Sequence, residues 1–180
     1  NSFSLELFYN NVKDMIAVKS VDYDSDEVNS DTALQYSNFE SVVIEGFNCH
    51  YDRKLNNRNQ LKFVYNYTNP SSSNIEALEM ISRHSFKMNY LYDIISNKMK
   101  FSLNVKYSDK KFLISDGSKI WLDDFFIFDG MFMLNVKDVL DFKFGCKNLF
   151  DYKDNRRFSS EYLTSYDPGR RFVAQISFKY

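Results

Sequence analysis

The sequence contains little of what most domains use to make turns, cross-links or metal sites. Its 180 residues include two prolines, five glycines and two cysteines. Cys49 and Cys146 stand far apart and outside any CxxC or Cys/His spacing, which argues against a zinc site and a disulfide framework, so we interpret both as free thiols. The formal net charge of -1 gives no electrostatic reason to expect nucleic acid as a partner.

A long hydrophobic run is also missing. The densest apolar stretch, from Phe125 to Phe128, is bounded by Asp124 and Asp129, whereas a membrane-spanning helix requires about 20 apolar residues. The sequence begins at Asn1 with no initiator methionine and no signal-peptide pattern, and we expect this start to be a cut rather than a natural N-terminus. Any role in a membrane must therefore use strands.

Apolar and polar side chains instead alternate along much of the sequence. Hydrophobic residues make up 44% and aromatic residues 18%, yet the mean hydropathy is -0.45. Such interleaving with a period of two predicts β-strands, and the expected fold class is all-β and antiparallel. We predict nine strands, near residues 2–9, 14–21, 37–51, 60–68, 85–92, 99–107, 122–136, 139–150 and 170–180.

The predicted connections alternate between short and long. The short ones are Asn10 to Lys13, Asp52 to Asn59, Asp93 to Asn97 and Lys137 to Asp138; the long ones are 22–36, 69–82, 108–121 and 151–169. This order is typical of an outer-membrane β-barrel, with short periplasmic turns and long extracellular loops. An odd number of strands would not close a bacterial barrel, which favours an incomplete barrel over a small complete one.

The alternation also predicts which face meets lipid. The Phe, Leu, Val and Met rows should face the bilayer, because Lys and Asn in the alternate rows are costly in hydrocarbon. Tyrosines near strand ends fit an aromatic girdle: Tyr51, Tyr67, Tyr90, Tyr92 and Tyr107. Strict alternation would place Glu45 among the lipid-facing residues, so we expect a β-bulge near Gly46. A soluble β-sandwich with aromatic inner faces is the alternative.

Two motifs near the C-terminus indicate a family. Asn148, Leu149, Phe150 and Asp151 form an NLFD sequence, and Pro168, Gly169 and Arg170 form a PGR sequence. Counted back from the end, one apolar row contains Tyr180, Phe178, Ile176, Ala174 and Phe172. This stretch resembles the closing strands of TonB-dependent outer-membrane receptors, in which a C-terminal aromatic row serves as the barrel-assembly signal.

The resemblance implies a location, partners and an activity. Residues 1–180 would be the C-terminal portion of the barrel, about the last nine of roughly 22 strands, with the plug domain and the first part of the barrel absent. The parent protein would lie in the bacterial outer membrane, be inserted by the barrel-assembly machinery, and contact lipid. It would take up a ferric siderophore, haem or cobalamin with energy relayed from the TonB complex through the missing plug. A complete small outer-membrane barrel, either an enzyme or an adhesin, remains the alternative.

Few residues suggest chemistry. Asp22, Asp24 and Asp26 could hold Ca²⁺, but Glu27 and Ala33 exclude an EF-hand, so we expect a solvated acidic loop. His50 and His84 should lie at opposite ends of the strands, and we predict no catalytic residue, cofactor or metal. Cationic, aromatic and imidazole side chains in the long loops are the candidate substrate contacts: Trp121, Arg156, Arg157, Tyr162, Tyr166 and His84.

Overall fold

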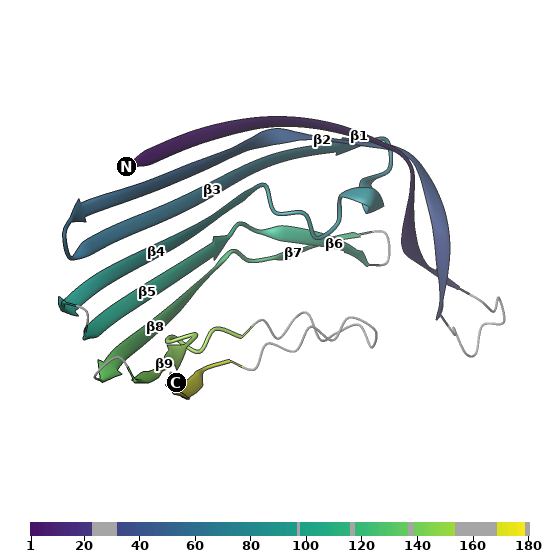
Figure 1. Cartoon of the computed structure of the whole chain (residues 1–180). Coiled ribbons are helices and arrows are strands. Elements are labelled where there is room, and N and C mark those ends of the chain that lie inside the picture. Colours follow the sequence, from purple (N-terminus) through teal and green to yellow (C-terminus); the bar gives the residue numbers. More distant parts are fainter. Residues whose placement is uncertain (23–31, 97, 116–117, 137–138, 154–168, 179–180) are drawn as a thin grey trace.

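The structure is a computed structural model that describes residues 1–22, 32–96, 98–115, 118–136, 139–153 and 169–178 (Figure 1). It contains an open antiparallel sheet of eight strands and a separate two-stranded hairpin. The main strands are β1 (Ser2–Asp22), β2 (Thr32–Asn56), β3 (Asn59–Ser72), β4 (His84–Ile95), β5 (Met99–Ser108), β8 (Phe125–Val136), β9 (Leu140–Lys147) and β10 (Arg171–Phe178). The hairpin consists of β6 (Lys111–Ser115) and β7 (Ser118–Leu122), and a 3-10 helix, η1, covers Ile75–Leu78. Within these ranges, no helix is long and apolar enough to cross a bilayer.

The strands follow one another across the sheet in chain order, and each pairs antiparallel with its neighbours. The outermost strands, β1 and β10, each pair with one strand and not with each other. The sheet curves into a trough, with the tight β2–β3 and β4–β5 turns at one end and the longer β3–β4 and β5–β8 connections at the other (Figure 1). The all-β antiparallel prediction is therefore confirmed, and the described connections separate into short and long ones at opposite ends of the sheet.

The tight turns are closed by local hydrogen bonds. Between β2 and β3, the Arg58 backbone N–H donates to Asn56 Oδ1 at 2.8 Å. Between β4 and β5, the Lys98 N–H donates to the Ile95 carbonyl at 2.9 Å. Such short turns fix the register of the strands they join, which is how the alternating rows are kept on constant faces.

One predicted turn is wrong, and it changes the strand count. Residues 10–13 lie inside β1, whose pairing with β2 runs through Asn10↔Ile44 and Lys13↔Ser41. Their polar side chains resemble a turn in the sequence, but a partner strand of 25 residues pairs with them on both sides of the expected break. The main sheet thus has eight described strands instead of nine, and the argument from an odd number no longer applies.

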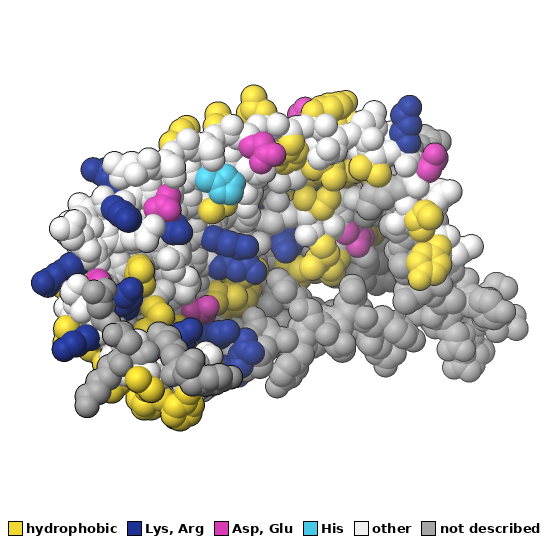
Figure 2. Space-filling view, viewed as in Figure 1, with side chains coloured by type: hydrophobic (Ala, Val, Ile, Leu, Met, Phe, Trp, Pro, Cys, Tyr) yellow, Lys and Arg dark blue, Asp and Glu magenta, His cyan; other side chains and the backbone are white. Residues whose placement is uncertain are grey.

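The two faces of the sheet differ in chemistry as the alternation predicts. The register aligns Phe63, Met88, Val105 and Phe128 in one row, while Lys62 and Asn89 lie opposite each other on the other face. Figure 2 shows lysine and arginine side chains gathered in the hollow and hydrophobic side chains along the outer rim. The concave face is therefore the polar one, and the convex face is the apolar one.

Glu45 belongs to the apolar row without any bulge. The register runs unbroken from Phe47 through Gly46 to Glu45 against both β1 and β3, so the predicted bulge is wrong. Glu45 Oε1 accepts a hydrogen bond from Asn69 Nδ2 at 2.9 Å, in a row where Asn69 follows Tyr67. The carboxylate is tolerated because the strands continue past the aromatic residues into a polar zone.

The apolar face has no covering layer in the described part of the chain. Leu7 is 76% exposed and Phe172 83% exposed. A soluble sandwich buries one face of each sheet beneath a second sheet, so this exposure argues against that alternative. One small buried cluster lies on the concave side, where Ala77 of η1 packs on Val42 of β2.

Candidate ligand-binding site

A cavity at the long-loop end of the trough lies between two connections that are distant in sequence. One is the β3–β4 connection, which carries η1, and the other is the β6–β7 hairpin between β5 and β8. Ala77 and Leu78 anchor η1 by packing against Val42 and Ile44. This contact draws the β3–β4 connection onto the concave face, where it meets the hairpin.

Hydrogen bonds then hold the two connections together. The Met80 backbone N–H donates to the Phe112 carbonyl at 3.0 Å. The Ile114 N–H donates to Glu79 Oε1 at 2.9 Å. Because these bonds join the loop to strand β6, the side chains of both segments keep a fixed relation to each other.

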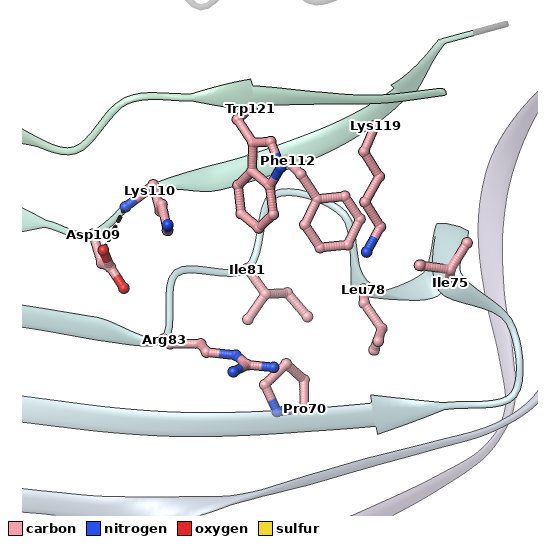
Figure 3. Close-up of a pocket in the computed structure, with 10 residues that line it drawn as sticks. All are labelled: Pro70, Ile75, Leu78, Ile81, Arg83, Asp109, Lys110, Phe112, Lys119 and Trp121. Atoms are coloured by element: carbon pink, nitrogen blue, oxygen red, sulfur yellow. Dashed lines mark hydrogen bonds between the residues drawn. The ribbon is translucent and has the colours of Figure 1, made fainter. Parts of the chain in front are cut away.

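The cavity between them measures about 220 Å³ and opens to solvent. Its floor is apolar and its rim is charged (Figure 3). The lining residues are Pro70, Ile75, Leu78, Ile81, Arg83, Asp109, Lys110, Phe112, Lys119 and Trp121.

Two cation–aromatic contacts form one wall of the cavity. Lys110 Nζ lies 5.1 Å from the ring centroid of Trp121, and Lys119 Nζ lies 4.7 Å from that of Phe112. The two rings meet edge to face, with centroids 5.5 Å apart. Ammonium groups held over ring faces keep their charge at a defined place in the cavity.

The electrostatic balance of the cavity is positive. Arg83, Lys110 and Lys119 face a single lining carboxylate, Asp109, whose Oδ1 accepts a hydrogen bond from the Lys110 backbone N–H at 2.8 Å. In the described part of the chain, none of the three cations forms an ion pair. An anionic ligand with flat, polarisable groups would find both charge and ring surface here.

The predicted contact residues fall in different places. Trp121 lines the cavity, at 48% exposure. His84 lies on the convex face, where its Nδ1 is 2.7 Å from the Tyr65 hydroxyl, and it does not line the cavity. The remaining candidates, Arg156, Arg157, Tyr162 and Tyr166, are outside the described residues, as are Asp24 and Asp26. Asp22 is the last residue of β1, and the described residues contain no cluster of metal-binding side chains.

Several cavity residues were missed at the level of sequence, although a signal was present. Residues 108–121 were predicted to be a loop, yet two short apolar stretches, KFLIS at 111–115 and SKIWL at 118–122, stand on either side of an Asp-Gly pair. An Asp-Gly pair between two short stretches rich in apolar and β-branched residues is a hairpin signal, and it could have placed Phe112 on a strand. Arg83 and Lys110 gave no comparable signal, because their roles depend on contacts between separate loops.

The NLFD and PGR residues lie at the base of the β9–β10 connection. Asn148 is buried; its side-chain amide donates to the Tyr152 carbonyl at 2.8 Å, and its Oδ1 accepts the Tyr152 N–H at 2.9 Å. The Asn148 N–H donates to Asp129 Oδ1 at 2.8 Å, and the Leu149 N–H donates to the Phe128 carbonyl at 2.8 Å.

The second motif meets the first across this connection. The Arg170 N–H donates to Asp151 Oδ1, and Gly169, at a φ of +67°, is buried beside it. The hydrogen bond from the Arg170 backbone, followed by the charge of Lys153, lowers the pKa of Asp151. Phe172, Ala174, Ile176 and Phe178 alternate along β10 in the apolar rows, while Pro168 and Tyr180 are outside the described residues.

The fold and the cavity together define a curved barrel-wall sheet with a cationic, aromatic cavity at its long-loop end. The sequence model of the family described as "TonB dependent receptor-like, beta-barrel" matches residues 1–149. The chain therefore belongs to the TonB-dependent receptor β-barrel family, which is a family of outer-membrane receptors and transporters. No curated protein sequence matches it.

Solved structures of similar fold come from receptors of this kind. The siderophore receptor PirA from Acinetobacter baumannii matches 98% of the chain at 15% identity, with a TM-score of 0.73. The ferric enterobactin receptor PfeA from Pseudomonas aeruginosa, in complex with enterobactin, matches 97% at 17% identity, with a TM-score of 0.70. The ferric-catecholate import receptor Fiu from E. coli matches 97% at 16% identity, with a TM-score of 0.68. The chain spans 29%, 28% and 24% of these three proteins.

Proposed function

We propose that the chain forms barrel wall in an outer-membrane transporter that takes up an anionic ferric siderophore. Family membership supports the transport role, and similarity to receptors for enterobactin and ferric catecholates supports the ligand class. The single observation that carries the ligand class is the cavity, which is lined by three cations that pair with no described carboxylate and by two aromatic rings, each under a lysine ammonium group. Haem and cobalamin are the other ligand classes to be compared.

We also propose what each part of the chain contacts in the complete protein. Residues 1–180 form the last part of the barrel, the apolar convex face contacts outer-membrane lipid, and the β10 row serves the barrel-assembly machinery. Energy reaches the protein from the TonB complex through a plug domain. The proposed role is transport, because the family to which the chain belongs is one of receptors and transporters.

The ligand class follows from simple charge arithmetic. A ferric tris-catecholate is multiply negative, because three dianionic ligands surround one Fe³⁺ ion, and its catecholate rings are flat. A ferric tris-hydroxamate is neutral, because three monoanionic ligands balance the same ion. A cavity with a positive balance and exposed rings should therefore prefer the catecholate complex.

The test is uptake by the complete protein as its gene encodes it, produced in a bacterium without other iron receptors. Cells receive radiolabelled ferric tris-catecholate, ferric tris-hydroxamate, haem or cobalamin, with and without a functional TonB. We expect TonB-dependent uptake of the catecholate complex above the other three. Equal uptake without TonB would overturn active transport, and preference for haem or cobalamin would overturn the ligand class.

A further inference from the structure

Three exposed cationic side chains lie at the tight-turn end of the sheet, and we call them the turn-end cations. Arg53 of β2 pairs with Leu61, two residues from Phe63 along β3, and therefore belongs to the convex face. Arg58 stands in the β2–β3 turn and Lys98 in the β4–β5 turn. Each of the three is exposed, and none forms an ion pair with a described carboxylate.

The described carboxylates near these turns belong to the other face of the sheet. Asp52 Oδ2 lies 3.5 Å from Lys62 Nζ, on the concave side. Asp93 lies opposite Lys100 in the register, and Asp141 also belongs to a concave row. The acids at this end therefore neutralise the inner wall, and the turn-end cations have no charge partner among the described residues.

The turn-end cations border exposed apolar and aromatic surface. Leu55 is 50% exposed and Ile95 52% exposed, one beside each of the two turns. Arg53 Nη1 donates to the Tyr51 hydroxyl at 3.4 Å, so the tyrosine and the guanidinium meet at the edge of the convex face. A succession of apolar, tyrosine and cationic side chains is typical of the boundary between bilayer hydrocarbon and lipid headgroups.

Backbone hydrogen bonds hold the two turns in place. The Asp93 N–H donates to the Arg58 carbonyl at 2.7 Å, which joins the β2–β3 turn to β4. The Asn135 N–H donates to the Lys98 carbonyl at 2.7 Å, which joins the β4–β5 turn to β8. Figure 2 shows lysine and arginine side chains at this end of the sheet. Charges on a fixed backbone lose less freedom when they bind an anion.

We propose that Arg53, Arg58 and Lys98 bind the headgroup phosphate of an anionic phospholipid, such as phosphatidylglycerol, in the leaflet around the short-turn end. Guanidinium and ammonium groups form charge-assisted hydrogen bonds with phosphate oxygens. A zwitterionic headgroup carries its own cation and gains less from this surface. The inference rests on the membrane placement in the proposed function, and it adds a lipid selectivity that does not depend on the transported ligand.

The test measures lipid selectivity of the complete protein in phosphatidylcholine vesicles. Trace spin-labelled phosphatidylglycerol or phosphatidylcholine is added, and electron paramagnetic resonance gives the fraction of each label held at the protein surface. We expect the wild type to prefer phosphatidylglycerol about threefold or more at low salt, and less at high salt. The triple variant Arg53→Gln/Arg58→Gln/Lys98→Gln should lose most of this preference. An unchanged preference in the triple variant, or none in the wild type, would overturn the inference.

The matched control removes three charges from the concave face at the same end. Lys54 follows Arg53 in the chain but pairs with Gln60, in a concave row. The control Lys54→Gln/Lys62→Gln/Lys100→Gln should keep the preference, and so should the charge-retaining variant Arg53→Lys/Arg58→Lys/Lys98→Arg. An equal loss in the control would assign the effect to net charge, and the inference would fail. If heat-modifiable gel mobility shows that a triple variant folds poorly, the single variants Arg53→Gln and Lys54→Gln make the same comparison.

The remaining outcomes separate this inference from the proposed function, because the lipid measurement requires neither a transported ligand nor TonB. If uptake of ferric tris-catecholate fails and the lipid preference is present, the ligand class is wrong and the inference stands. If the complete protein does not insert into vesicles, the membrane placement is wrong and the inference fails with it. Sedimentation with purified peptidoglycan tests another anionic partner: binding lost in the triple variant, with lipid preference unchanged, would overturn the choice of phospholipid.

Discussion

The Arg170 backbone N–H donates to Asp151 Oδ1 at 2.6 Å, and this bond closes the base of the connection between β9 and β10. Lys153 Nζ lies 3.4 Å from Asp151 Oδ2, so the carboxylate binds partners through both oxygens. The bond joins the last residue of NLFD to the last residue of PGR. The two motifs that mark the family in the sequence thus meet in one hydrogen-bonded contact, Asp151 with Arg170 and Lys153, which we call the clasp.

Replacing Asp151 by Ala should loosen this clasp. The folded-state pKa of Asp151 lies below its ordinary value of 3.8, so its contribution is present above that pH and is lost as the pH falls through the folded pKa. We therefore expect the Arg170 amide to exchange its hydrogen faster in Asp151→Ala at pH 7, and the difference from the wild type to vanish in strong acid. Hydrogen exchange measured over this pH range provides the check.

Asp151→Asn is the companion variant for this clasp. It keeps an oxygen that accepts the Arg170 N–H and removes the charge that attracts Lys153. Its exchange should be intermediate and should not change through the acid range. Exchange in Asp151→Ala that equals the wild type at pH 7 would show that the bond does not hold the connection.

Gly46 and Gly130 offer a matched pair of substitutions within strands. A Cβ added at Gly46 would collide with the Tyr67 carbonyl oxygen and lie 2.9 Å from the Phe8 ring, whereas at Gly130 its nearest neighbour would be Leu149 Cδ1 at 3.6 Å. We expect Gly46→Ala to lose about 1–3 kcal/mol of unfolding free energy and Gly130→Ala to lose little. Urea unfolding in detergent micelles measures both, and equal losses would contradict the close approach at Gly46.

The alternation of apolar and polar residues predicted the sheet well, because it follows from the two environments that the faces of the sheet meet. A strand between lipid and a polar interior must change chemistry at every residue, so rows such as Phe63 with Met88 could be predicted before their register was known. Beyond the aromatic residues the strands leave the zone in which one face must be apolar, so alternation is less strictly required there. There, the polar stretch at residues 10–13 looked like a turn, and Glu45 looked like a bulge.

The cavity was less predictable, because it is made by contacts between loops. Trp121 could be chosen for its chemistry alone, but Arg83 and Lys119 become significant only when Met80 and Phe112 join their two connections. His84 illustrates the opposite error: its position after a long loop suggested a ligand contact, whereas the register directs it to the convex face beside Tyr65. Strand parity decides which side a residue near a loop will face.

Leu103 and Asn104 are adjacent in β5 and lie on opposite faces, so they test which face meets lipid. Leu103→Lys should cost about 2–4 kcal/mol if this position lies near the bilayer midplane, whereas Asn104→Lys adds the same charge to the polar face. We expect the first variant alone to fold poorly into lipid vesicles, as followed by heat-modifiable gel mobility. Poor folding of Asn104→Lys with normal folding of Leu103→Lys would reverse the assignment of the faces.

Trp121 tests whether the cavity binds the ligand through ring surface. Its indole supports Lys110 and meets the Phe112 ring, so Trp121→Ala removes a binding surface and releases a cation. We expect the affinity for ferric tris-catecholate to fall about three- to tenfold, or roughly 0.7–1.4 kcal/mol, and Trp121→Phe to lose less. Phe150→Ala is the control, because Phe150 is also an exposed aromatic residue but lies outside the cavity, against Phe128. Equal losses in Trp121→Ala and Phe150→Ala would show that the cavity does not hold the ligand.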